Sequence, residues 1–227
     1  MNELWTDIGP GLWPAYWVTI KLTFFSAIGS LLWGTVLAGM RVSPVPVMRF
    51  FGTWYVNIVR NTPLTLIIIF CSVGLYQNLG LALAPENENF IDNNNFWLAV
   101  LGFTFYTSTF VCETLRSGFN TVPIGQAEAA RSLGLPFSKV FTLIVLPQAI
   151  RSVIGPMGSV LIALTKNTTI ASAIGVAEAS LLMKEQIENH ADQVIWIFAI
   201  IAAGFMVLTL TEGFVFGYLA KRLAVKR

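Results

Sequence analysis

The sequence has few charged residues, and this shortage indicates its class. Only 11% of the 227 residues are Asp, Glu, Lys or Arg, whereas a soluble domain usually carries about 25%. Hydrophobic residues make up 55% of the chain. The formal net charge is only +2, which gives no support for a nucleic-acid partner. These proportions predict an integral membrane protein in contact with lipid.

The residues that commonly carry catalysis or bind metals are also scarce. The single histidine, His190, cannot build a metal site alone. Cys71 and Cys112 both lie in apolar runs, where cysteine usually acts as a small buried hydrophobic residue rather than half of a disulfide. The phosphate-binding pattern G-x-x-x-x-G-K-[ST] does not occur. We therefore expect no catalytic residues, no metal and no cofactor on this chain, which is not an enzyme by itself.

Long apolar segments predict the fold. A membrane-spanning helix needs about 20 mainly apolar residues, and five segments qualify: 18–40, 64–83, 96–115, 150–174 and 194–219. Residues 50–59, which are rich in aromatic side chains, predict a helix lying at the membrane interface. Lipid contact excludes open strands. We expect an all-α, polytopic membrane protein whose residues 1–227 form a single transmembrane domain.

The distribution of basic residues predicts the orientation. Lysines and arginines are more frequent in cytoplasmic loops. The segments facing the other side, 1–17, 84–95 and 176–193, contain one basic residue, Lys184. We therefore expect the N-terminus outside and the C-terminus inside, with these residues in the cytoplasm: Arg41, Arg49, Arg116, Arg131, Lys139, Arg151, Lys221, Arg222, Lys226 and Arg227.

The polar loop between the third and fourth spans has the pattern of a helical hairpin. Pro123 favours the start of a helix over residues 126–133. Gly134 suits the position just after a helix, and Pro136 prevents the helix from continuing. A second helix then leads toward Pro147. This loop predicts a compact helical knob on the cytoplasmic face that is too small to be an enzyme domain.

The spacing within this loop resembles the signature of one protein family. Glu128, Ala129 and Ala130 are followed after three residues by Gly134, and after nine more by the I-x-L-P of residues 144–147. This pattern is similar to that of permease subunits of bacterial ABC importers. In that family the loop is the coupling helix that docks on the ATP-binding subunit. The resemblance implies that these four residues make that contact.

Two more segments resemble the permeases for polar amino acids. Residues 59–64 match R-x-T-P-L, and residues 164–172 match the lysine-containing end of the fourth span. The resemblance covers nearly the whole chain and favours glutamate as the cargo. Glutamine, aspartate or a basic amino acid remain alternatives within the same machine.

The resemblance also implies partners and a mechanism. These are two ATP-binding subunits carrying ATP and Mg²⁺, a second permease chain, preferably a related but different one, and an extracellular solute-binding protein. Transport would occur by alternating access in the cytoplasmic membrane. An ion-coupled secondary carrier is the rival from another class, but five spans without an internal repeat fit it poorly.

Lys166 is the ionisable residue whose position most suggests a function. It lies deep in the fourth predicted span, beside Asn167 and Thr168. A lysine there needs water, a ligand or a counter-charge. The sequence allows a substrate carboxylate, Glu178, or an acid of a second chain as its partner. We place Lys166, Asn167 and Thr168 on the substrate pathway.

Other charges allow two interpretations. Arg60, near Thr62 at the start of the second span, is either a flanking cytoplasmic charge or part of the pathway. We include both residues among the pathway candidates. Glu113 and Arg116 are three residues apart, which favours a structural ion pair on one helix face.

Small residues suggest close helix packing. Ser30 and Gly34, and likewise Gly213 and Gly217, are four residues apart. Such pairs allow helices to approach closely, either within this chain or toward a second permease chain. The glycines and proline at 155–158 predict a bend in the fourth span.

Overall fold

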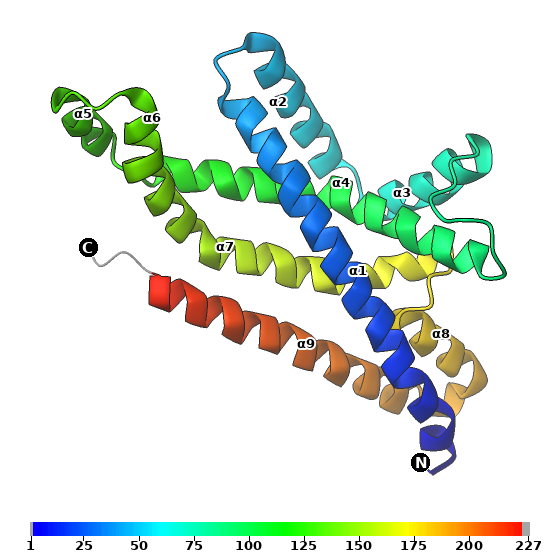
Figure 1. The fold of residues 1–227 in the computed structure, drawn as a ribbon. Coiled ribbons are helices and arrows are strands. Elements are labelled where there is room, and N and C mark those ends of the chain that lie inside the picture. The colour runs from blue at the N-terminus through cyan, green and yellow to red at the C-terminus, as the bar shows by residue number, and fades with distance from the viewer. Residues whose placement is uncertain (1, 224–227) are drawn as a thin grey trace.

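A computed structural model describes residues 2–223, and all the regular structure in that range is helical (Figure 1). The main elements are α1 (Asn2–Val42), α2 (Pro46–Asn61), α3 (Leu64–Ile69), η1 (Phe70–Asn78), α4 (Phe90–Asn120), α5 (Ile124–Ser132), α6 (Phe137–Val140), η2 (Phe141–Val145), α7 (Leu146–Asn167), η3 (Thr168–Ile174), α8 (Ala179–Asn189), η4 (Ala191–Gln193) and α9 (Val194–Leu223). The all-α prediction is therefore confirmed for the described residues. Lys226 and Arg227, which were predicted to lie in the cytoplasm, are outside the described residues.

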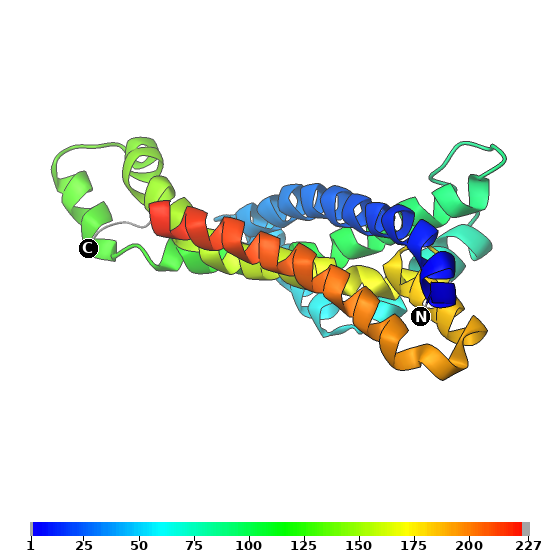
Figure 2. The same cartoon turned by 90° about the horizontal axis from the view of Figure 1, so that it is seen from below.

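The long helices run roughly along one axis and give the molecule two distinct ends (Figure 2). One end carries α5 and the last turns of α9, and we call it the α5 end. The other carries the start of α1, α8 and the connection between η1 and α4, and we call it the α8 end. The segments predicted to be cytoplasmic and extracellular are thus separated in space.

Four helical segments are long and apolar enough to cross a membrane: Trp5–Val42, Phe90–Asn120, Phe137–Ile174 and Ala191–Leu223. A fifth crossing requires that Pro46–Asn61 and Leu64–Asn78, which meet at an angle of 104°, be counted as one broken span. The structure therefore contains four or five candidate spans.

The helix predicted to lie at the interface packs with one face against the bundle, and most of its other residues are exposed. Figure 1 shows α2 folded back beside α1, and it also contacts α4. Val56 of α2 is fully buried, and the hydroxyl of Tyr55 donates to the carbonyl of Phe105 at 3.1 Å. The helix ends at Asn61 because Pro63 disfavours helical geometry at Thr62, whose backbone is extended. If the bent pair is counted as one crossing, α2 forms its first half.

The first helix begins earlier than predicted. It starts at Asn2 rather than near residue 18 and continues through Pro10 and Pro14. Ile8 and Ala15 are buried, and they pack in apolar clusters with side chains of α8 and α9. Burial of this face explains why the prolines do not end the helix, since tertiary contacts offset the lost hydrogen bonds.

The fourth span also differs from its prediction. Its helical segment begins at Phe137 rather than near residue 150, and α7 includes Pro156. The bend predicted at residues 155–158 stays a prediction. At Thr168, α7 passes into the 3-10 turns of η3. Gly175 ends this segment with a φ of +79°, a conformation that glycine adopts readily.

Close packing of α1 on α4 forms the centre of the fold. A methyl group added to Gly34 would lie 2.6 Å from Val111 of α4, so only glycine allows this approach. Ser30, one turn away, is fully buried. This pair therefore serves packing within the chain. By contrast, nothing lies within 4 Å of a methyl group built on Gly217.

Candidate functional site

The α5–α6 hairpin forms the predicted knob at the α5 end (Figure 2). Helix α5 follows Pro123 and ends before Gly134, whose φ is +80°. The amide of Gly134 donates to the carbonyl of Arg131 at 2.9 Å, and the amide of Leu135 donates to that of Ala130 at 3.2 Å. This pair of bonds is the Schellman cap. The predicted short helix and its glycine cap are confirmed.

The motif residues of the knob differ in exposure. Glu128, Ala129 and Gly134 are exposed. Ala130 is only 4% exposed, so its methyl group packs inside the hairpin. The adjacent Leu133 is 83% exposed. The knob therefore exposes both a carboxylate and a large apolar side chain, a combination suited to contact with another protein.

Polar contacts connect the knob to the long helix α7. The amide nitrogen of Gln148 in α7 donates to the side-chain oxygen of Gln126 in α5 at 2.6 Å. Within the knob, the guanidinium carbon of Arg131 in α5 lies 5.8 Å from the ring centre of Phe137 in α6, within range of a cation–π contact. Displacement of α5 would therefore act on the base of α7.

Helix α7 leaves one narrow face uncovered between α4 and α9. Its exposed residues recur at helical spacing and are mostly small or polar: Ser152, Pro156, Ser159, Ala163 and Lys166. Both neighbouring helices contact α7. Small and polar side chains are typical of helix contacts and aqueous pathways in membrane proteins, not of lipid-facing surfaces.

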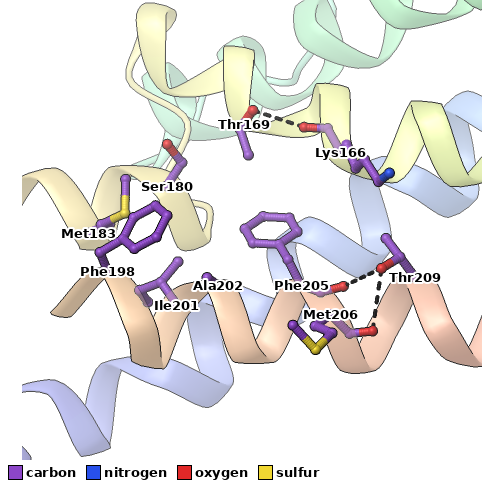
Figure 3. Close-up of a pocket in the computed structure, with 10 residues that line it drawn as sticks. All are labelled: Lys166, Thr169, Ser180, Met183, Phe198, Ile201, Ala202, Phe205, Met206 and Thr209. Atoms are coloured by element: carbon purple, nitrogen blue, oxygen red, sulfur yellow. Dashed lines mark hydrogen bonds between the residues drawn. The ribbon is translucent and has the colours of Figure 1, made fainter. Parts of the chain in front are cut away.

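Lys166 borders a cavity of about 410 Å³ between α7, η3, α8 and α9 (Figure 3). Thr169, Ser180 and Thr209 supply hydroxyl groups to its wall, while Phe205 and several aliphatic side chains make the rest apolar. Within residues 2–223 Lys166 forms no ion pair. This cavity can accept an anionic group against an otherwise apolar surface.

A second cavity, of about 350 Å³, lies on the other side of the exposed face, between α4 and α7. Tyr106 and Phe110 of α4 face Ser159 and Asn167 of α7 across it. The guanidinium carbon of Arg60 lies 5.9 Å from the ring centre of Phe110, where the aromatic face attracts a cation. Arg60 is thus connected to this cavity only through Phe110 and is not among the residues that line it.

The structure divides the predicted pathway residues into two groups. Lys166 and Asn167 line the two cavities that flank the exposed face of α7. Thr168 is fully buried, and its hydroxyl donates to the carbonyl of Thr165 at 2.7 Å. The hydroxyl of Thr62 donates to the carbonyl of Ile58 at 2.9 Å. Both threonines thus satisfy their own helices and line neither cavity.

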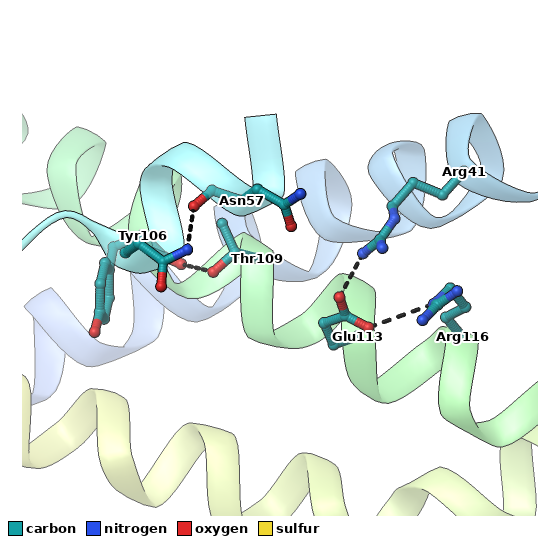
Figure 4. A network of polar contacts seen from close by, with 7 residues as sticks. Arg41, Asn57, Tyr106, Thr109, Glu113 and Arg116 are labelled. Atoms are coloured by element: carbon teal, nitrogen blue, oxygen red, sulfur yellow. Dashed lines mark hydrogen bonds and ion pairs between the residues drawn. The ribbon is translucent and has the colours of Figure 1, made fainter. Parts of the chain in front are cut away.

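A polar network joins α1 to α4 near the α5 end (Figure 4). Glu113 of α4 accepts from Nη1 of Arg41 at 2.5 Å and from Nε of Arg116 at 3.4 Å. The predicted pair of Glu113 and Arg116 is confirmed. The shorter contact, from the end of α1, was not predicted, because no local spacing connects residues 72 positions apart.

Glu178 is engaged away from Lys166. Its buried carboxylate accepts from the backbone amides of Ser180 at 2.8 Å and Leu181 at 3.0 Å, which caps α8. Burial raises the pKa of Glu178 to about 7, against the opposing effects of these hydrogen bonds and of Lys184. Of the partners considered for Lys166, Glu178 is therefore already occupied in this structure.

Glu212 is a polar residue between α9 and α7 that was not predicted. The hydroxyl of Thr165 donates to its Oε1 at 2.6 Å. Its Oε2 is enclosed and has no hydrogen-bond partner in the described part of the chain. The available signal was a carboxylate inside the long apolar run of α9.

Comparison with known proteins identifies the family. The family described as binding-protein-dependent transport system inner membrane component matches residues 30–225. The glutamate transport system permease protein GluC of Corynebacterium glutamicum is 64% identical over 228 residues, covering all of both chains. The probable glutamine ABC transporter permease protein GlnM of Bacillus subtilis is 33% identical over 209 residues, covering 92% of this chain and 91% of that one.

A solved structure supports the same assignment. The crystal structure of an amino acid ABC transporter with histidines includes a chain that is 28% identical to this one. The two match with a TM-score of 0.83, covering 94% of each chain. Because the family pattern extends over most of the sequence, this chain belongs to the family of binding-protein-dependent transport system inner membrane components.

Proposed function

We propose that this chain is the permease of an ATP-binding cassette importer and that its cargo is glutamate. The observation that carries the cargo is the full-length identity of 64% to a permease named for glutamate transport. The more distant relative is named for glutamine. It supports the same type of transporter, but with a cargo drawn from the polar amino acids more generally.

The energy for transport comes from separate subunits. The sequence contains no phosphate-binding loop, so two ATP-binding subunits carry ATP and Mg²⁺. The family description implies an external solute-binding protein that delivers the cargo. A second permease chain, preferably a related but different one, completes the passage. Cargo and ATP shift the pair of permeases between outward-open and inward-open states by binding them unequally.

The α5 end faces the cytoplasm in this proposal. Arg131 and Lys139 belong to the α5–α6 hairpin, whereas Glu86 and Asp92 belong to the connection at the α8 end. The excess of basic residues on one side supports this orientation. The whole chain, residues 1–227, then acts as one transmembrane domain.

The knob at the α5 end is the coupling element. Glu128, Ala129 and Gly134 are exposed and available to an ATP-binding subunit. Ala130 is buried and does not contact the ATP-binding subunit directly. Its small side chain allows α5 to pack closely in the hairpin. The bond between Gln126 and Gln148 would pass a displacement of the knob to α7.

The exposed face of α7 supports a route for the cargo. Glutamate carries two carboxylates. Lys166 is a cation that lines one of the two cavities flanking this face, and Arg60 is a cation in contact with Phe110, which lines the other. Asn167 offers an amide to the same route. Thr168 and Thr62 do not contact the cargo in this proposal. Each hydroxyl donates to a carbonyl of its own chain segment and stabilises the backbone near Lys166 and Arg60, respectively.

Uptake of labelled glutamate by cells with and without this chain tests the proposal. We expect ATP-dependent uptake that disappears without the chain, and weaker competition by aspartate, glutamine and arginine than by glutamate. If the uptake of another amino acid is lost instead, the assignment of glutamate as the cargo is wrong, whereas the assignment as an ABC importer permease stands. Uptake that survives ATP depletion and fails when the ion gradient collapses would favour a secondary carrier.

A further inference from the structure

Glu212 is the one charged residue of the sequence between Val194 and Ala220. A carboxylate within a membrane span is costly, and such residues usually serve a specific contact or a pathway. None of the roles assigned above uses Glu212, so its retention in the apolar run of α9 needs another explanation.

The contact of Glu212 lies directly beside the Lys166 cavity. Its partner, Thr165, is 1% exposed and precedes Lys166 in α7. On α9, Thr209 and Gly213 lie on either side of Glu212, and both line a cavity of about 390 Å³ together with Lys166. The bond from Thr165 to Glu212 thus joins the two helices at the level of these cavities.

The other contacts between α7 and α9 at this level are apolar. A methyl group on Gly158 would meet Phe216 at 2.5 Å, and one on Gly213 would lie 3.8 Å from Ile162. In a bilayer, close packing of this kind brings two helices together, but an apolar contact has no preferred direction. A hydrogen bond between side chains adds a directional contact to this packing.

We propose that Glu212 is a positioning residue. By accepting from Thr165 it fixes α9 against α7, and so sets the width of the cavity in which Lys166 meets the carboxylate of the cargo. The role of this cavity rests on the proposed function, whereas the fixing of α9 does not.

Substitutions that remove or keep the bond test this role in the reconstituted complex. Glu212→Leu and Thr165→Val remove it. We expect the glutamate carried per ATP hydrolysed to fall about three- to ten-fold, with the ATPase rate within about two-fold of the wild type. Glu212→Gln keeps an acceptor oxygen and Thr165→Ser keeps a hydroxyl, so both should restore the ratio. The double variant should be no worse than the worse single variant.

A cross-linking measurement separates this inference from the identity of the cargo. Cysteines replace Ile162 and Gly213, and alanines replace Cys71 and Cys112. In membranes without cargo, Glu212→Leu should slow cross-linking by a short bis-thiol reagent at least about three-fold. An unchanged rate would overturn the positioning role, as would a Gln variant as impaired as Leu. A slowed rate in a complex that does not carry glutamate would overturn only the proposed cargo.

Discussion

Arg41 and Glu113 are joined at 2.5 Å between the end of α1 and the last third of α4 (Figure 4). The arginine side chain is 9% exposed and the glutamate side chain 28%. Gly52 of α2 packs against the stem of the same arginine, where an added methyl group would lie 2.9 Å from its Cγ. This ion pair therefore ties three helices together at the α5 end.

Removal of the carboxylate should destabilise the permease strongly. Glu113→Ala leaves the buried guanidinium of Arg41 without a partner, and we expect the free energy of unfolding to fall by about 3 kcal/mol. Arg116→Ala removes the exposed contact to the same carboxylate and should cost about 1 kcal/mol or less. Thermal unfolding of the purified chain in detergent measures both. If the free energy of unfolding falls equally in the two variants, the contact between Arg41 and Glu113 is no stronger than the exposed contact to Arg116.

The stability of the permease should depend on the protonation of Glu178. Burial raises the pKa of this residue from its usual value near 4.5 to about 7. The folded state then holds a proton that the unfolded state releases. The free energy of unfolding therefore has its full contribution from this group below pH 4.5. It falls by about 3 kcal/mol in total as the pH rises to about 7.

The Gln variant isolates this effect. Glu178→Gln keeps an oxygen that can accept from Ser180 and Leu181 but carries no charge. Between pH 4.5 and pH 7.5 the Tm of the wild type should fall by about 6 °C more than that of the variant. Parallel curves for the two proteins would show that Glu178 has its ordinary pKa.

The orientation predicts opposite accessibility of two engineered thiols. Glu88→Cys lies in the connection at the α8 end and should react with a membrane-impermeant reagent added outside intact cells. Lys139→Cys lies in the α5–α6 hairpin and should react only after the membrane is opened. The native Cys71 and Cys112 are buried and should give little background. The reverse labelling pattern would invert the topology.

Charge reversal in the knob should uncouple transport. Glu128→Arg replaces an exposed carboxylate on α5 and should reduce both cargo uptake and cargo-stimulated ATP hydrolysis about ten-fold or more. Glu86→Arg makes the same change at the α8 end and serves as the control. Co-purification of the ATP-binding subunit separates lost docking from lost insertion. Full activity of the Glu128 variant would remove this residue from the coupling surface.

Features encoded locally were predictable from the sequence. Apolar runs indicated where the spans lie, and Gly134 with Pro123 defined the limits of α5, because caps and breakers act within a few residues. Helix ends were less predictable. Helix α1 begins at Asn2 because Ile8 and Ala15 find partners on distant elements, and no local signal indicates such contacts.

Long-range polar contacts were the main features missed. The partner of Glu113 on α1, and that of Glu212 on α7, depend on which helices become neighbours. The pathway residues show the same limit. Lys166 and Asn167 are adjacent in sequence and border different cavities, a separation that only the arrangement of α4 and α9 around α7 reveals.

Reconstitution tests the central claim most directly. The purified complex, containing this chain with its second permease and ATP-binding subunits, is placed in vesicles with the binding protein outside and ATP inside. We expect labelled glutamate to accumulate with ATP but not with a non-hydrolysable analogue. Lys166→Met should reduce the accumulation about ten-fold through loss of a charge-assisted contact, while assembly is kept. ATP-independent accumulation, or a Lys166→Met complex with wild-type rates and affinity, would contradict the account.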